Sequence, residues 1–203
     1  MNSDLEIKSP ARPKQRRSAK TLEKMIAAVE QLLQERDFRE VTMADIAKSA
    51  GVTAALLYTR FRNKDELEVY VTSLFLERYI HDLKTAREGL EGPCAREPES
   101  LIRTFGEVTF AYRAVIRSIL TRQLSGQPFT PKEDALITER AIFLEDWMSE
   151  CSDQGLTTEQ IKIRVLTLIQ TIQAYAMHTR VEGYLPYDQF CSLLGSSFGV
   201  SSQ

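Results

Sequence analysis

The sequence is poor in the two residue types that most often bind transition metals or form disulfides. Its 203 residues include three cysteines and two histidines. Cys94, Cys151 and Cys191 are far apart, odd in number and without C-x-x-C spacing, which indicates a reduced, cytoplasmic protein rather than a disulfide framework. Neither His81 nor His178 has a Cys, Asp or Glu at the spacing of a zinc site, so we predict no metal site.

The sequence also lacks the patterns of membrane proteins, secreted proteins and the commoner enzymes. No apolar run is long enough for a membrane span, and the charged N-terminus has no apolar signal segment. No phosphate loop or dinucleotide fingerprint is present, so no cofactor is expected. Residues 195–199 match G-x-S-x-G, but no strand is predicted before them and no histidine follows His178. We therefore predict no catalytic residue and no enzyme activity.

What the sequence does have is an uneven distribution of charge. Residues 1–64 carry 13 Lys and Arg against 8 Asp and Glu, whereas residues 65–203 carry 13 against 20. A basic end on an acidic body favours contact with a polyanion such as DNA through that end alone. Residues 1–17, which include Arg16 and Arg17, are predicted to be a disordered arm. The arm is either a solvated tail or a segment that follows the DNA backbone or enters the minor groove.

Apolar residues recur at helical spacing along most of the remaining chain, and no long segment alternates as a strand would. The sequence therefore predicts an all-α fold of about nine helices, with a DNA-binding domain over 18–66 and a helical domain over 67–203. The run at 100–124 is expected to form two helices or one kinked helix. The connection after the first helix has no glycine, so Asp37 or its neighbour is expected to adopt the left-handed conformation. The predicted helical runs outside the segment 42–62 are 18–35, 63–88, 100–124, 130–153, 157–182 and 187–198.

The segment 42–67 predicts two short helices joined by a tight turn. Thr42 is a good N-cap, with Asp45 at the reciprocal position of a capping box. Gly51 supplies the positive φ that ends the first helix, and Thr53 caps the second. Two short helices around a glycine turn are the signature of a helix-turn-helix motif. In DNA-binding proteins the second helix of this motif lies in the major groove.

The spacing of many residues in this segment resembles that of one known family. The residues that carry the resemblance are Thr42, Ile46, Ala47, Ala50, Gly51, Val52, Thr53, Leu57, Tyr58, Phe61, Lys64 and Leu67. This pattern resembles the N-terminal domain of TetR-family transcriptional regulators over about residues 18–67. The resemblance implies DNA phosphate contacts from Thr53, Tyr58 and Lys64, while partial burial of Tyr58 or a solvated Lys64 is the alternative.

The base-facing positions of the second helix depart from the commoner pattern of the family. Ala54, Ala55 and Leu56 are apolar, and apolar side chains can contact thymine methyl groups but cannot read guanine edges. We therefore expect weak direct readout from these positions, with more of it from Thr59, Arg60 and the arm. Arg60 could equally contact a phosphate. Thr42, Arg16 and Arg17 complete the candidate DNA-binding residues.

By the same resemblance, the helical domain should bind a small molecule and form a dimer. The candidate ligand-binding residues are Phe75, Tyr79, Phe105, Tyr112, Phe143, Trp147, Tyr175 and His178. Aromatic residues at helical spacing are often ordinary core, which is the alternative for each. Arg113 and Arg117 could hold an acidic ligand or pair with Glu107 or Asp146. The helices at 158–182 and 187–198 are expected to pair in a homodimer, unless their apolar surface is core.

These observations predict a homodimeric, sequence-specific DNA-binding transcriptional regulator. The preferred interpretation is a repressor that a small-molecule ligand releases from a palindromic operator of double-stranded DNA. An activator, or a regulator that needs its ligand as co-repressor, is the alternative within the class. A helical ligand- or partner-binding protein without specific DNA reading is the alternative outside it.

Overall fold

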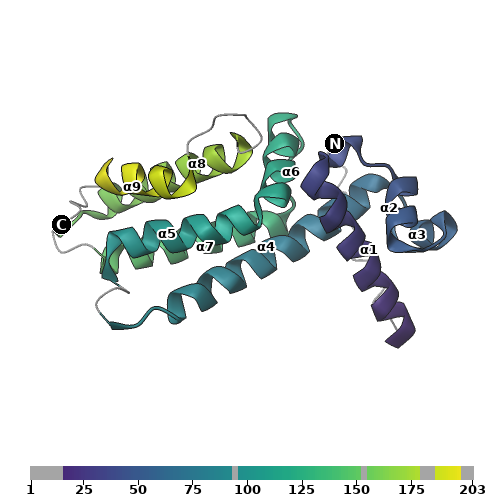
Figure 1. Cartoon of the computed structure of the whole chain (residues 1–203), viewed down its shortest axis with the longest axis horizontal. Coiled ribbons are helices and arrows are strands. Elements are labelled where there is room, and N and C mark those ends of the chain that lie inside the picture. The colour runs from purple at the N-terminus through teal and green to yellow at the C-terminus, as the bar shows by residue number, and fades with distance from the viewer. Residues whose placement is uncertain (1–15, 93–95, 152–154, 179–185, 198–203) are drawn as a thin grey trace, which may run out of the picture. The chain divides into compact units, whose positions relative to one another are not determined.

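The computed structural model of the chain describes residues 16–92, 96–151, 155–178 and 186–197. Within these ranges the fold is all-α and contains no strand, as predicted (Figure 1). The helices are α1 (Arg16–Glu35), the 3-10 turn η1 (Phe38–Glu40), α2 (Met43–Ala50), α3 (Ala54–Arg60), α4 (Lys64–Glu88), α5 (Pro98–Ala111), α6 (Arg113–Leu124), α7 (Pro131–Glu150), α8 (Thr158–His178) and α9 (Tyr187–Ser197). None of the described helices is long and apolar enough to cross a membrane.

The chain forms two compact units. The first ends at Leu74 and is called the N-terminal unit here; the second begins at Phe75 and is called the body. The helix α4 contributes residues to both, because it runs without a break from Lys64 to Glu88. The predicted domain limits, 18–66 and 67–203, stay a prediction.

The core of the N-terminal unit forms where α1 packs on α2 and α2 packs on α3. The apolar stripe of α1 is buried because its members recur every three or four residues. The buried residues of the three helices are Leu22, Met25, Ile26, Ala28, Val29, Leu33, Met43, Ile46, Ala47, Ala50 and Leu57. The spacing of the apolar positions thus places one face of each helix inward and leaves the opposite face exposed.

The expectation of a left-handed residue at Asp37 was wrong. Asp37 has φ −76° and ψ 151°, which is extended backbone, and it precedes η1. Its backbone N–H donates to the Glu40 carboxylate at 3.1 Å. The short 3-10 turn reverses the chain with ordinary backbone angles and buries Phe38, so no glycine is needed there.

In the body, the run predicted over 100–124 divides into two helices, as expected. Helix α5 ends at Ala111 and α6 begins at Arg113, with Tyr112 between them at φ −95° and ψ 9°. The Tyr112 hydroxyl donates to the Asp82 carboxylate of α4 at 2.5 Å. This bond ties the junction between α5 and α6 to α4.

The helices α4 to α8 all contribute buried residues to the core of the body, and α9 packs on α5 and adds Leu194. Figure 1 shows α5 and α7 running alongside each other, and the two helices are in contact. Trp147 of α7 and Phe105 of α5 are completely buried in this core. Helix α7 begins as its sequence predicts, with a capping box between Thr130 and Glu133 and with Pro131 in its first turn.

Candidate functional site

The turn before α3 is built from local interactions. Thr42 and Asp45 form the predicted capping box at the start of α2. Gly51 has φ 64° and ψ 35°, and its N–H reaches the carbonyl groups of the last turn of α2. The Thr53 hydroxyl then accepts a hydrogen bond from the Leu56 N–H at 3.2 Å. These contacts fix where α3 begins and which face it turns inward.

One face of α3 is buried and the other is exposed. Leu57 and the following Phe61 are completely buried against the rest of the N-terminal unit. The exposed face carries Thr53, Ala54, Ala55, Leu56, Tyr58 and Thr59. Leu56 is 42% exposed and Tyr58 is 52% exposed, although both are large and largely apolar. Such a face on a short helix is suited to contact with a partner molecule.

Lys64 is held at the start of α4 by neighbouring backbone. Its ammonium donates to the Arg39 carbonyl oxygen at 3.0 Å and lies 5.1 Å from the centre of the Phe38 ring. Desolvation by partial burial lowers the pKa of Lys64 from its ordinary value, against the raising effect of Glu68 and Asp65. An ammonium has three N–H donors, so this placement is compatible with a further bond to a phosphate.

Three other candidates donate to groups within the protein. The Thr42 hydroxyl donates to Asp45 at 2.8 Å, and the Thr59 hydroxyl donates to the Ala55 carbonyl at 2.8 Å. Arg60 is half-buried and donates to the Ser18 carbonyl oxygen at 3.0 Å and to the Ser18 hydroxyl. Base contacts by Thr59 and Arg60 would require these bonds to be exchanged, and the proposal that they read bases stays a prediction.

The predicted arm falls largely outside the described residues. Residues 1–15 lie outside the described ranges, and α1 begins at Arg16, two residues before its predicted start. Arg16 and Arg17 therefore form the first turn of α1, and their side chains are not among those described. Their role in DNA binding stays a prediction.

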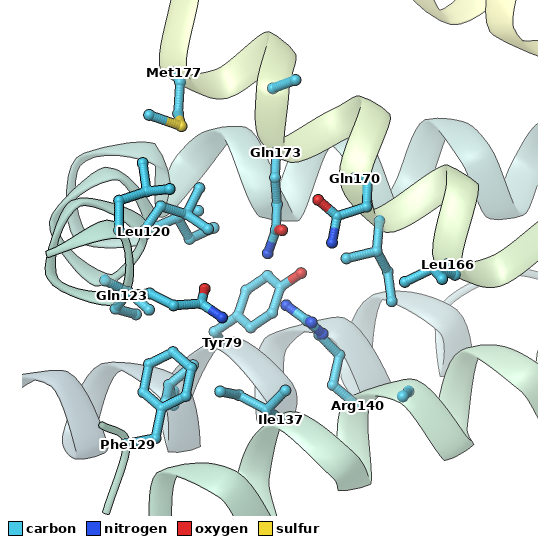
Figure 2. A pocket seen from close by; sticks show the side chains of 17 residues that line it. Tyr79, Leu120, Gln123, Phe129, Ile137, Arg140, Leu166, Gln170, Gln173 and Met177 are labelled. Carbon is cyan, nitrogen blue, oxygen red and sulfur yellow. The ribbon is translucent and has the colours of Figure 1, made fainter. Parts of the chain in front are cut away.

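The body contains a cavity of about 600 Å³ between α4, α6, α7 and α8. Figure 2 shows its wall, with polar side chains near the centre of the view and apolar ones around them. The lining residues are Leu76, Tyr79, Ile116, Ile119, Leu120, Gln123, Leu124, Phe129, Ile137, Arg140, Ala141, Leu166, Ile169, Gln170, Gln173, Ala174 and Met177. A cavity of this size and composition is typical of small-molecule sites.

Of the seven predicted ligand-binding residues whose side chains are described, only Tyr79 lines this cavity. Phe75, Tyr79 and Tyr112 together line a much smaller void beside α6. Phe105 and Trp147 are core residues, and the half-buried Phe143 packs against Trp147 with ring centres 6.0 Å apart. Tyr175 is stacked on Phe190 of α9, and the side chain of His178 lies outside the described residues.

Apart from Tyr79, the polar groups of the cavity belong to residues that the sequence analysis did not predict, namely Gln123, Arg140, Gln170 and Gln173. Arg140 is only 8% exposed and lines the cavity beside Tyr79. The Tyr79 hydroxyl lies 2.9 Å from the Thr109 hydroxyl, and burial raises the pKa of this phenol while the neighbouring positive charge of Arg140 acts to lower it. A signal was present, because Arg140 lies four and seven residues before the buried Leu144 and Trp147, and thus on the inward face of α7.

The other arginines considered from the sequence do not line the cavity. Arg113 donates to the Phe110 carbonyl oxygen at 3.0 Å, and its guanidinium lies 4.5 Å from the centre of the Phe110 ring. Arg117 is buried, with 8% exposure. Arg140 is therefore the arginine that lines the cavity, and a role of Arg113 or Arg117 in holding an acidic ligand stays a prediction.

The comparisons with known proteins agree with this architecture. Residues 25–70 match the family model described as bacterial regulatory proteins, tetR family. Over these residues the chain carries the DNA-binding domain of TetR-family transcriptional regulators, as its sequence predicted. Regulators with this domain bind DNA and are not enzymes.

Solved structures of regulators share the fold of this chain at low sequence identity. AibR in complex with isovaleryl coenzyme A and operator DNA is 17% identical, with a TM-score of 0.64 over 87% of this chain and 97% of that one. FadR from Bacillus subtilis in complex with stearoyl-CoA is 15% identical, with a TM-score of 0.61 over 88% and 96%. A regulator from Aquifex aeolicus VF5 is 16% identical, with a TM-score of 0.64 over 89% and 98%. No curated protein sequence matches the chain.

Proposed function

We propose that this regulator is a repressor that binds a palindromic operator as a homodimer and is released when a small molecule enters the body cavity. The observation that carries the proposal is the continuity of α4. This single helix begins with Lys64, the candidate phosphate ligand, and lines the cavity with Leu76 and Tyr79. A ligand that displaces the cavity-lining part of α4 therefore acts on the same helix that presents Lys64.

The DNA contacts of the proposal come from α3 and the start of α4. Thr53, Tyr58 and Lys64 offer two hydroxyl groups and an ammonium to phosphates, which position a protein on the duplex. Ala54, Ala55 and Leu56 are exposed, as base-contacting residues must be, and are suited to thymine methyl groups. The AibR structure, which contains operator DNA, supports this use of the fold.

The dimer of the proposal would use the helices at 158–182 and 187–198. In the described part of these helices, Ile163 and Leu166 of α8 are 65% and 58% exposed, and Leu193 of α9 is 61% exposed. Large exposed apolar side chains on both helices are typical of a surface that another chain covers. A two-fold dimer would also present two copies of α3 to half-sites about one helical turn apart.

The dimer is tested by Ile163→Arg, with the oligomeric state measured by sedimentation velocity. We expect the wild-type chain to sediment as a dimer and the variant to dissociate, because the new charge would be buried without a partner. Ile142→Arg is the matched control, since Ile142 of α7 is 54% exposed and lies outside the proposed interface. Dissociation of both variants, or of neither, would contradict the proposed interface.

The function is tested by selecting bound sequences from a random pool of double-stranded DNA. Enrichment of a palindrome whose half-sites are about one helical turn apart would support both DNA reading and two-fold symmetry. The enriched operator then serves to screen small molecules for release of the protein. If the enriched sequences are not palindromic, the result argues against the dimer. If folded protein enriches no sequence, the result argues against sequence-specific DNA binding in the absence of a ligand.

A further inference from the structure

Arg122 and Arg140 are two of the three arginines that are buried in the described part of the body, and their surroundings differ. Arg122 donates to the Glu133 carboxylate at 2.6 Å, with the two side chains 5% and 0% exposed. The Arg140 Nε has no hydrogen-bond partner, and no carboxylate of the described residues lies within 4 Å of this guanidinium. The Nε and Nη1 of Arg122 also lack hydrogen-bond partners, so the difference between the two arginines is the carboxylate. A buried charge is costly unless it is paired, and of these two arginines Arg140 is the one that needs explaining.

The groups beside Arg140 are hydrogen-bond donors rather than acids. Figure 2 shows the Arg140 guanidinium, the Tyr79 hydroxyl and the side-chain amides of Gln170 and Gln173 directed toward one central region of the cavity. Burial is the main influence on the pKa of Tyr79 and raises it from its ordinary value, so the phenol keeps its proton at neutral pH. An anion placed there would meet one full positive charge and several N–H and O–H donors.

The remaining wall of the cavity is apolar. Leu120, Phe129, Ile137, Leu166 and Met177 surround the polar centre in Figure 2. No Asp, Glu or Lys is among the residues that line the cavity within the described ranges. The wall therefore fits a molecule with one negative group and an apolar remainder, and it disfavours a cation or a molecule with several charges.

We propose that the effector of this regulator is an amphipathic organic acid whose single anionic group binds Arg140, with Tyr79, Gln170 and Gln173 as further donors. The inference rests on the proposed function, in which the body cavity is the effector site. A carboxylate suits the planar guanidinium fork because two parallel hydrogen bonds can form. A phosphate monoester shares this chemistry, and the experiment separates the two headgroups.

Calorimetric titration of the full chain with dodecanoate, dodecyl phosphate and dodecanol, all below micelle formation, tests the inference. We expect at least one of the two anions to bind about tenfold or more tightly than dodecanol, which has the same chain without charge. Preference for dodecanoate would identify the carboxylate, and preference for dodecyl phosphate would identify the phosphate monoester. Equal binding of all three, or no binding of either anion, would overturn the proposal.

The role of Arg140 is tested with Arg140→Met, which keeps the apolar stem and removes the charge. We expect binding of the preferred anion to weaken about tenfold or more, with dodecanol binding unchanged. The control is Arg103→Met, because Arg103 is exposed and pairs with Glu99 and Asp188 away from the cavity. If the two variants bind the anion equally well, Arg140 is not the anion ligand.

Thermal unfolding without ligand separates a binding role from a structural one. Removing a buried charge that lacks a counter-charge should leave the midpoint of Arg140→Met at or above that of the wild type, as followed by fluorescence of Trp147. If the midpoint of Arg140→Met falls clearly below that of the wild type, Arg140 stabilises the fold by holding Tyr79, and the inference is wrong.

Failure of the inference and failure of the proposed function give different results. If an organic acid binds through Arg140 but does not change the affinity for the operator, the proposed acid-binding site is supported and the proposed release by ligand is contradicted. If an uncharged molecule releases the operator and binds the wild type and Arg140→Met equally well, the proposed function is supported and the acid-binding site is contradicted.

Discussion

The N-terminal unit and the body use charged side chains in opposite ways. Every charged residue that is buried in the described part of the chain, namely Arg117, Arg122, Glu133 and Arg140, belongs to the body. In the N-terminal unit the charged groups stay at or near the surface and act locally. Asp45 holds the backbone and side chain of Thr42, three residues away, and Glu66 accepts from the Arg62 N–H at 2.7 Å.

The difference follows from what each unit has to contact. A DNA-binding surface needs its charges and donors exposed, because phosphates approach from solvent. A cavity for an acid needs its positive charge inside, where low polarity strengthens the interaction but also makes an unpaired charge costly. In these proposals, an interior charge without a counter-charge, as at Arg140, marks the binding site of the body, whereas exposed charge marks that of the N-terminal unit.

The largest expected effect comes from breaking the buried pair of the body. Glu133→Ala should lower the free energy of unfolding by about 3–5 kcal/mol, because it leaves Arg122 buried without its carboxylate. Urea unfolding followed by the fluorescence of Trp147, the single tryptophan, measures the effect in the body.

The matched control for Glu133→Ala is Glu139→Ala, which removes the exposed pair between Lys84 and Glu139. Those side chains are 41% and 47% exposed, so the expected loss is about 0–1 kcal/mol. If the two variants lose the same free energy of unfolding, burial of an ion pair does not determine its contribution to the stability of the body.

A smaller effect is expected from the turn of the N-terminal unit. Gly51→Ala should lower the free energy of unfolding by about 1–2 kcal/mol, because an L residue is strained at φ 64°. No side chain would be met, since nothing lies within 4 Å of the added methyl group. Urea unfolding followed by far-ultraviolet circular dichroism measures the loss.

Gly51→Asn is the control, because asparagine tolerates the left-handed conformation better than alanine and should lose less. The Trp147 transition should stay where it is in the wild type if the two units unfold separately. A shift of that transition equal to the shift of the dichroism signal would show that the stability of the two units is coupled.

Substitutions on the exposed face of the N-terminal unit should change the free energy of unfolding least, and their expected effects are on DNA binding. Lys64→Ala should weaken binding to all DNA sequences alike and reduce the salt slope of log K by about one, because one phosphate contact is lost. Leu56→Arg should instead change the preferred sequence, since an arginine reads guanine edges and a leucine does not. Both are measured by titration of fluorescent operator DNA over a range of salt concentrations.

Lys132→Ala is the control for these two DNA-binding variants. Lys132 is an exposed body residue that pairs with Glu77, so its loss should leave the salt slope unchanged. An unchanged salt slope in Lys64→Ala would remove Lys64 from the phosphate contacts. A Leu56→Arg variant that selects the same operator as the wild type would remove Leu56 from the base contacts.

The sequence predicted the N-terminal unit in detail because its signals are short-range. The caps by Thr42 and Thr53 and the positive φ of Gly51 each depend on residues within four positions. The same holds for the Thr130 cap of α7 and for the division of 100–124 at Tyr112. The prediction at Asp37 was wrong because η1 provides a second way to leave α1, which a missing glycine does not reveal.

The sequence by itself therefore determined the helices, their caps and the exposed face of α3, since these depend on periodicity and on neighbours along the chain. Only the tertiary structure decided which side chains line the cavity. Tyr79 and Thr109 are 30 residues apart, and aromatic spacing alone did not separate Phe105 and Trp147, which are core, from Tyr79, which lines the cavity. Periodicity predicts that Arg140 lies on the inward face of α7, but it does not predict which residues of other helices lie opposite that face. Only the packing of the helices shows that Arg140 faces a cavity rather than a filled core.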